Sequence, residues 1–358
     1  MLDATRLPIF DGHNDVLLNL YLPERGGGRS FFERSERGHI DLPRARDGGF
    51  AGGFFAAFVP NARGDDAPEK PEPEFTENGY MFPLAEAIDR TYAQRVAIGL
   101  TALLYRLEEE SRGQVKVVRS AAEMESCLRD GTLAAVLHFE GAEAIDPELD
   151  YLYLFHAAGL RSLGLVWSRP NAFGCGVPFA FPRTPDTGPG LTDAGRELVR
   201  ACNRLRIMLD LSHLNERGFW DVAELTNAPL VVTHACAHAI SPTSRNLTDR
   251  QLDAVGESDG IVGVNFNVGF IREDGMPNAD TPLTQIVRHV DYIANRIGID
   301  RVAFGSDFDG ATMPRELGDV AGLPTLVTAL RAAGYDDAAL RKIAYENWLR
   351  VLRKTWGR

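Results

Sequence analysis

The sequence predicts a (β/α)8 TIM barrel, because strand-like and helix-like segments alternate about eight times along its 358 residues. Most strand-like segments are near-continuous apolar runs, which is typical of parallel strands that are covered on both faces. The length also suits this fold, since α/β barrels often exceed about 250 residues as one domain. We therefore expect a single barrel domain over residues 1–358.

The expected elements follow one another in a regular order. The strand-like runs rich in Val, Ile, Leu and Phe cover residues 8–11, 52–59, 133–139, 162–167, 207–211, 230–233, 261–266 and 302–305. Apolar residues at helical spacing predict amphipathic helices at 80–107, 121–128, 149–158, 192–204, 216–225, 249–255, 284–297 and 323–333. The tail at 336–356 is expected to add one or two closing C-terminal helices.

Two segments are too long and irregular to be simple connections. Residues 60–76 contain five acidic residues and four prolines, which predicts a solvated surface excursion. Residues 169–190 are rich in Pro and Gly and follow a predicted strand, so we expect a loop over one end of the barrel. This second segment is a candidate active-site loop.

Composition excludes several functional classes. The formal net charge is −12 and no basic run stands out, so we expect no nucleic acid and no membrane as a partner. The longest apolar runs are far below the roughly 20 residues needed to span a bilayer, and residues 1–10 lack the layout of a signal peptide. We therefore expect a cytoplasmic protein. Its four cysteines form no C-x-x-C pair, which argues against a thiolate zinc site.

Residues that can bind metal follow five of the eight predicted strands, whose C-terminal ends open onto one face of a barrel. They are His13 and Asp15 after the first strand, Glu140 after the third, His213 after the fifth, His234 after the sixth and Asp307 after the eighth. Each histidine alone could be a hydrogen-bonded residue at a strand end, and Glu140 alone could cap a helix. Together they are hard to explain by packing, which has no use for unpaired carboxylates there.

The residue types indicate a metal centre with two ions. His13 and Asp15 lie two residues apart, so on an extended segment both side chains point the same way. Imidazole and carboxylate ligands suit Zn²⁺, with Mn²⁺, Co²⁺ or Fe²⁺ as competitors. A typical mononuclear catalytic zinc has three protein ligands. The sequence offers five such groups, namely His13, Asp15, Glu140, His213 and His234, which favours two ions that share Glu140. A carbamylated lysine is not expected as the bridge, because the four lysines lie away from the strand ends.

These residues belong to motifs that resemble the membrane (renal) dipeptidase family of binuclear zinc peptidases, including its soluble bacterial members. The motifs are DGHND at 11–15, GHIDLP at 38–43, FEG at 139–141, LDLSH at 209–213, RN at 245–246 and GSDFDG at 305–310. The resemblance covers nearly the whole chain and implies an amidohydrolase-like barrel with two zinc ions. It assigns His13 and Asp15 to one ion, His213 and His234 to the other, and Glu140 to both.

The resemblance also implies a reaction, the hydrolysis of dipeptides, including those with a D-residue at the C-terminal side. It assigns the acid/base role to Asp307 and the binding of the substrate carboxylate to Arg245. This is chemically consistent, since two ions lower the pKa of a shared water and polarise the scissile carbonyl. A carboxylate can then carry the proton to the leaving amine, and a guanidinium matches a free carboxylate. A homodimer is an assembly that the resemblance allows.

One position departs from the family pattern. Some members carry a histidine after the fourth strand, where this chain has Trp167, which can pack or donate a hydrogen bond but cannot act as an acid or base. We expect Trp167 to shape the substrate pocket, with Asn171 or Arg169 helping to bind the carbonyl oxygen. We also expect His138 to face the other side of its strand from Glu140.

Two rival functions stay open at this point. One is a metal-dependent hydrolase of another amide, such as an N-acyl amino acid or a β-lactam. The other is a non-catalytic metal-bound scaffold, which would have no need of a proton carrier such as Asp307.

Overall fold

The computed structural model describes residues 7–25, 27–61 and 72–357. Its main sheet consists of eight parallel strands, neighbours being hydrogen-bonded in the order β1-β2-β6-β7-β9-β10-β11-β12. They are β1 (Ile9–Asn14), β2 (Phe50–Phe58), β6 (Leu133–Glu140), β7 (Ser162–Gly164), β9 (Met208–Asp210), β10 (Val231–Ala235), β11 (Ile261–Val264) and β12 (Val302–Phe304). A short strand, β5 (Val115–Val117), also pairs with β6. All eight predicted strands are confirmed, although several end earlier or later than expected.

The first and last strands in this order, β1 and β12, meet at their C-terminal ends. Asn14 forms a parallel bridge with Phe308, which follows β12. The Asp307 amide donates to the His13 carbonyl at 3.0 Å, and the Asp15 amide donates to the Phe308 carbonyl at 2.8 Å. These bonds close the barrel at the end where the polar residues were expected.

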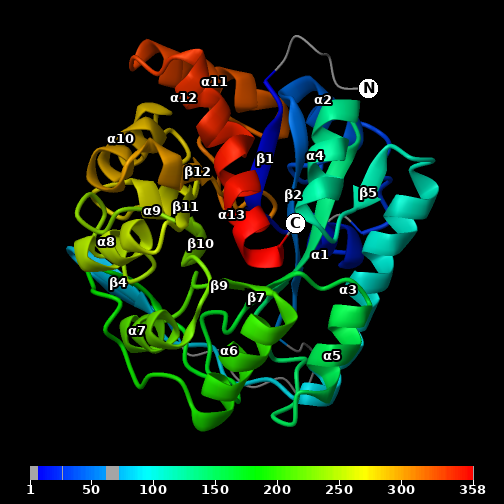
Figure 1. Cartoon of the computed structure of the whole chain (residues 1–358). Coiled ribbons are helices and arrows are strands. Elements are labelled where there is room, and N and C mark those ends of the chain that lie inside the picture. Colours follow the sequence, from blue (N-terminus) through cyan, green and yellow to red (C-terminus); the bar gives the residue numbers. More distant parts are fainter. Residues whose placement is uncertain (1–6, 26, 62–71, 358) are drawn as a thin grey trace.

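Helices surround the strands, as Figure 1 shows. They are α1 (Val16–Tyr21), α2 (Leu42–Gly48), α3 (Arg90–Glu110), α4 (Ala121–Asp130), α5 (Asp150–Ala157), α6 (Asp193–Leu205), α7 (Glu216–Leu225), α8 (Asp249–Glu257), α9 (Val268–Ile271), α10 (Thr284–Ile297), α11 (Leu323–Ala332), α12 (Asp337–Arg341) and α13 (Asn347–Trp356). Short 3-10 turns cover Ile299–Arg301 and Val320–Gly322, and a π-helical turn, Lys342–Glu346, joins α12 to α13. Many helices begin at a side chain that accepts a hydrogen bond from the first turn, as Asp89, Ser120, Thr192 and Asn215 do.

The C-terminal helix α13 covers the N-terminal end of the barrel, in front of the strands in Figure 1. Trp348 is fully buried, packs against Phe54 with ring centroids 5.1 Å apart, and donates from its indole to the Phe304 carbonyl at 3.1 Å. Apolar residues from the first halves of the barrel strands pack in the same cluster. Because this end is filled by apolar side chains, a polar site is left to the opposite end.

A second, antiparallel sheet corrects part of the sequence prediction. Its strands β3 (Glu74–Thr76), β4 (Gly79–Phe82) and β8 (Phe179–Phe181) pair in the order β3-β4-β8. The helix expected at 80–107 begins only at Arg90, because residues 80–82 pair with β8 instead. Pro83 could have signalled this, since the residue before a proline favours an extended backbone.

The two irregular segments, 60–76 and 169–190, differ in what the structure shows of them. Within 60–76, residues 62–71 lie outside the described residues, and Glu74–Thr76 forms an exposed strand. The segment 169–190 contains strand β8, so it is more ordered than its composition suggested. Across the described ranges, no helix is both long and apolar enough to cross a membrane.

Candidate metal centre

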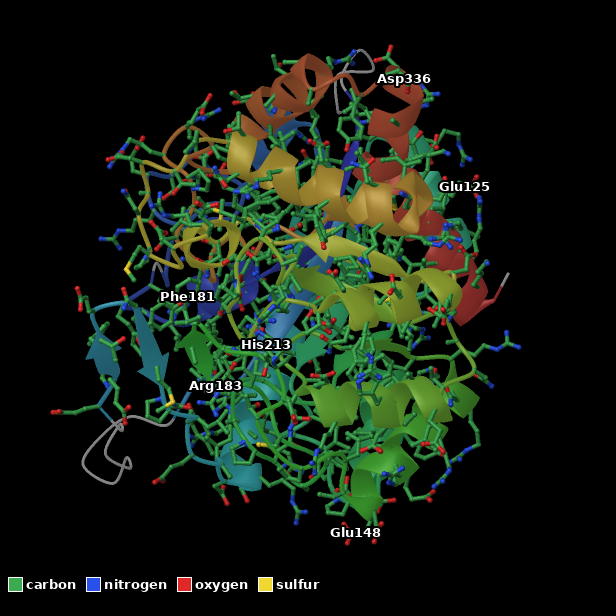
Figure 2. All side chains as sticks on the ribbon, turned by 90° about the vertical axis from the view of Figure 1, so that its left-hand side faces the viewer. Glu125, Glu148, Phe181, Arg183, His213 and Asp336 are labelled. Carbon is green, nitrogen blue, oxygen red and sulfur yellow. The ribbon has the colours of Figure 1, made fainter. Side chains whose placement is uncertain are left out.

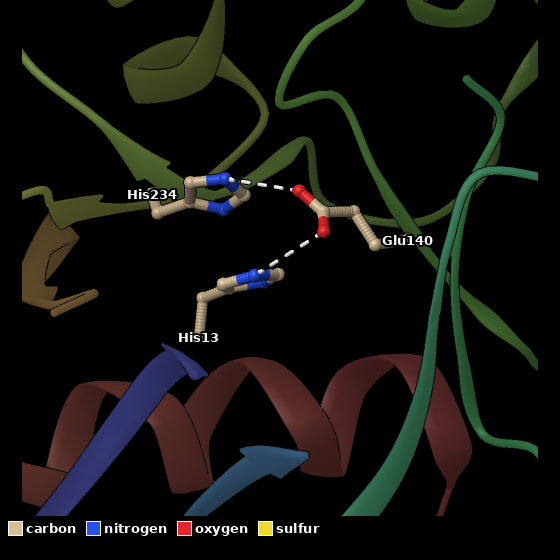
Figure 3. A group of neighbouring side chains, drawn as sticks. All are labelled: His13, Glu140 and His234. Atoms are coloured by element: carbon tan, nitrogen blue, oxygen red, sulfur yellow. Dashed lines mark ion pairs between the residues drawn. The ribbon is translucent and has the colours of Figure 1, made fainter. Parts of the chain in front are cut away.

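The five predicted metal ligands and the predicted acid/base, Asp307, meet at the C-terminal end of the barrel. His13 lies in β1, Glu140 ends β6 and His234 lies in β10. Asp15 directly follows β1, and His213 and Asp307 lie three residues after the ends of β9 and β12. All six are buried, with exposed fractions of at most 9%. Figure 3 shows the rings of His13 and His234 one above the other, with the carboxylate of Glu140 facing both from one side.

The two oxygens of Glu140 face different imidazole groups. Its Oε2 lies 3.7 Å from His13 Nε2. Its Oε1 lies 2.9 Å from His213 Nε2 and 3.6 Å from His234 Nε2. On the other side, His13 Nε2 is 3.5 Å from Asp15 Oδ2. The carboxylate of Glu140 thus lies between two groups of nitrogen and oxygen donors.

These donors fit a metal ion. Two overlapping sets, His13 with Glu140 and His234, and His13 with Asp15 and Asp307, have ligand atoms within 4.8 Å of one another. Both ring nitrogens of His13 and one oxygen of Asp15 are buried without a hydrogen-bond partner among the described residues. A buried polar atom without a hydrogen-bond partner destabilises the folded state unless a ligand or ion binds to it. A donor set of imidazole and carboxylate without thiolate suits Zn²⁺ and similar divalent ions.

The electrostatics of the cluster also favour a cation. Burial raises the pKa of Glu140 well above its usual value and raises that of Asp307 to about 6. Burial lowers the pKa of His13, but the Glu140 and Asp15 carboxylates outweigh this effect and raise it to about 10. A bound cation would act against these shifts, because it favours the ionised form of the carboxylates and the neutral form of the imidazole.

Hydroxyl groups orient two of the histidines. Thr233 Oγ1 lies 2.8 Å from His234 Nδ1 and donates to Asp210 Oδ2 at 2.6 Å. Ser168 Oγ lies 2.9 Å from His213 Nδ1. Contacts of this kind fix the ring orientation of metal-binding histidines and leave Nε2 free to bind.

A cavity of about 130 Å³ opens beside the cluster. Part of its lining consists of Asp15, Glu140, His213 and Asp307, and four aromatic side chains form much of the rest. The aromatic side chains are Phe58, Trp167, Phe179 and Phe270. Figure 2 labels His213 near the middle of the view and Phe181, which belongs to β8 of the small sheet, to its left.

Arg245 does not line this cavity and is almost fully buried, with an exposed fraction of 4%, but it borders a smaller pocket together with His213. Its guanidinium carbon is 5.4 Å from the ring centroid of Phe270, which lines the cavity. Its Nη2 donates to the His234 carbonyl at 3.3 Å, whereas its Nε has no hydrogen-bond partner in the described part of the chain. A buried guanidinium with unused donors suits an anionic group of a ligand.

Comparison with known proteins decides the family. The sequence model of the membrane dipeptidase family, peptidase family M19, matches residues 4–356. The chain belongs to this family. The family and the barrel fold that the sequence predicted are therefore confirmed, and this M19 chain is a metallopeptidase of the dipeptidase type.

Solved structures and sequence relatives agree. A structure described as the dipeptidase AC, a metallopeptidase of family M19, is 51% identical, with a TM-score of 0.91, over 98% of this chain and 99% of that one. A metallopeptidase from Rhodobacter sphaeroides, liganded with a phosphinate mimic of the dipeptide L-Ala-D-Ala, has the same identity, coverage and TM-score. The dipeptidase tcpJ of Claviceps purpurea is 29% identical over 96% of this chain and 76% of its own length.

Three neighbouring residues lie in other surroundings than the sequence suggested. Asn171 does not line the cavity, and its side-chain amide donates to the Leu165 carbonyl and accepts from the Phe173 amide, so its part in substrate binding stays a prediction. Arg169 does not line it either, since it is fully buried in an ion pair. His138 faces the barrel interior, with its ring centroid 5.5 Å from that of His13. The alternation rule could have shown this, because residues two apart share one face of a strand.

Sequence reasoning missed other residues of the site. Asn265 donates to Asp307 Oδ2 at 3.0 Å, and Arg25 and Asn267 line the cavity. Asn265 interrupts the apolar run at 261–266, so its position was a usable signal. Nothing in the sequence near Arg25 pointed to the site.

Proposed function

We propose that this M19 chain hydrolyses the peptide bond of dipeptides, with L-Xaa-D-Xaa as well as L-L substrates. The observation that carries the proposal is the position of Glu140 between His13 and the pair His213 and His234, with Asp307 on the same cavity. The small volume of the cavity suits a short substrate. The Rhodobacter relative, solved with a mimic of L-Ala-D-Ala, supports the substrate class.

The donor set would hold two divalent ions, with Zn²⁺ the first expectation and Mn²⁺, Co²⁺ or Fe²⁺ as alternatives. His13 and Asp15 would bind one ion, His213 and His234 the other, and Glu140 both. When bound, such ions lower the pKa of water and polarise the substrate carbonyl.

Asp307 would be the acid/base of the reaction. Its carboxylate accepts a proton from the attacking water and returns it to the amine that leaves. The hydrogen bond from Asn265 holds the carboxylate in a fixed orientation at the cavity.

Two further parts of the site would bind the substrate. Arg245 would bind the free C-terminal carboxylate and so limit how far the peptide enters. Trp167 would form one wall for the substrate side chains. The segment 169–190 would act as an active-site loop, and Phe179, which lines the cavity, supports this role. A homodimer stays a prediction.

The test is amino-acid release from a matched panel of L-L, L-D and N-acylated dipeptides. It compares zinc-loaded protein with the same protein treated with a chelator. We expect chelator-sensitive cleavage of the free dipeptides. Cleavage only of N-acyl amino acids or β-lactams would favour another amide hydrolase, and no cleavage by the loaded protein would favour the scaffold.

A further inference from the structure

Arg169 is a charged side chain beside the site that the proposed chemistry does not use. It is fully buried and does not border the cavity. Its Nη2 donates to the Val59 carbonyl at 2.6 Å, and its Nη1 donates to Asn61 Oδ1 at 2.9 Å. Since Val59 and Asn61 follow β2 and Arg169 follows β7, the guanidinium joins two segments at the same end of the barrel.

The third nitrogen of the guanidinium contacts another segment. Arg169 Nε lies 3.1 Å from Oε1 of Glu143, which follows β6 and whose side chain is 2% exposed. Neither oxygen of Glu143 has a hydrogen-bond partner among the residues described, so the ion pair is its main compensation. Two of the three guanidinium nitrogens are thus held by hydrogen bonds, and the third lies in an ion pair, so the group is held from three segments of the chain.

The same guanidinium contacts two aromatic rings of the site. Its central carbon is 4.9 Å from the ring centroid of Trp167 and 5.3 Å from that of Phe58. The two rings are themselves 5.0 Å apart, and both line the cavity. A cation at such distances attracts the ring faces, and the attraction grows when water is excluded.

We propose that Arg169 is a positioning residue that sets substrate preference by holding the wall formed by Phe58 and Trp167. This inference rests on the proposed function. Arg169 acts through Trp167 and touches no reacting group, so its replacement should change which side chains are accepted. A lysine keeps the charge but cannot donate to Val59 and Asn61 from two nitrogens of one planar group.

The experiment measures kcat/KM of Arg169→Lys on two dipeptide series, Xaa-Ala and Ala-Xaa, in which Xaa is Gly, Ala, Leu or Phe. We expect the ratio between the Phe and Gly members to change at least fivefold in one series. The control is Arg44→Lys, another buried arginine paired with carboxylates, those of Asp41 and Asp319. The control should lower stability without changing either ratio.

Two further variants separate positioning from a general structural role. In a Trp167→Leu background, Arg169→Lys should cause no further change in the ratio. Glu143→Gln should shift the ratio in the same direction as Arg169→Lys, and it replaces that variant if the lysine protein does not fold. An unchanged ratio, or the same shift in the absence of Trp167, would overturn the proposal.

A measurement without turnover separates this proposal from the proposed function. Acrylamide quenching of Trp167, obtained by subtracting the signal of the matching Trp167→Phe protein, should rise at least twofold in Arg169→Lys. If the parent protein cleaves no dipeptide, the proposed function fails and quenching alone decides the role of Arg169. Unchanged quenching would then refute it.

Discussion

The Nε2 atoms of His213 and His234 face each other at 3.2 Å. Two protonated rings could not adopt this arrangement, because both nitrogens would carry a proton and a positive charge. Burial lowers the pKa of both histidines well below the usual value, which keeps them neutral. With their Nδ1 atoms directed at Ser168 and Thr233, both Nε2 lone pairs are available to a cation.

The first prediction concerns metal content. His234→Ala removes one nitrogen beside Glu140 Oε1, so we expect the bound metal to fall by about one ion per chain, on the rule that losing a ligand weakens a site strongly. Elemental analysis after dialysis measures this. His238→Ala is the matched control, because His238 contacts the Arg183 carbonyl and lies outside the cluster. Equal metal content in both variants would remove His234 from the ligand set.

The second prediction separates metal binding from proton transfer. Asp307→Asn keeps the size of the side chain but cannot accept a proton, so we expect kcat to fall by about 10² to 10⁴. Metal content should stay near that of the parent protein. Asp309→Asn is the control, since Asp309 accepts a hydrogen bond from the His39 amide and supports the loop. Turnover that survives in Asp307→Asn would contradict the acid/base role.

The third prediction concerns the substrate carboxylate. Arg245→Ala should raise KM for free dipeptides by about 10- to 150-fold, which corresponds to the roughly 1.5–3 kcal/mol of a charged hydrogen bond. C-terminally amidated dipeptides have no carboxylate to lose, so their KM should change little. Steady-state kinetics on matched pairs tests this, and equal losses on both would exclude Arg245 from this role.

The sequence was sufficient for the barrel because its strands are short apolar runs that recur between amphipathic helices. It also predicted that His13, Glu140, His213 and His234 would meet, because parallel strands bring their C-terminal ends to one face. That inference needs no knowledge of side-chain contacts. It therefore did not depend on the detailed packing of the barrel.

Contacts between distant segments could not be predicted in the same way. Strand β4 exists because residues 80–82 pair with β8, about 100 residues later in the chain. The partners of Arg169 lie 26 residues away at Glu143 and 110 residues away at Val59. A polar residue in a loop can bind either substrate or its own backbone, and Asn171 does the latter.

The last prediction concerns a histidine remote from the metal ligands. His289 in α10 is fully buried, accepts a hydrogen bond from the Ala237 amide and donates one to the Ile271 carbonyl, each at 3.1 Å. Its Nδ1 must therefore stay unprotonated, and burial lowers its pKa to about 4. The unfolded chain takes up the proton near the ordinary value of about 6.5, so the folded state loses stability as the pH falls from there towards 4.

The expected contribution of His289 to this loss is about 2 kcal/mol in the free energy of unfolding between pH 7.5 and pH 5. Urea denaturation of metal-free protein at the two pH values measures it, with His289→Gln as the comparison. Glutamine offers one acceptor and donors but does not titrate, so every other ionisable group contributes equally to both proteins. The parent should lose about 2 kcal/mol more than the variant over this range. Equal losses would show that His289 does not control the acid sensitivity of the fold.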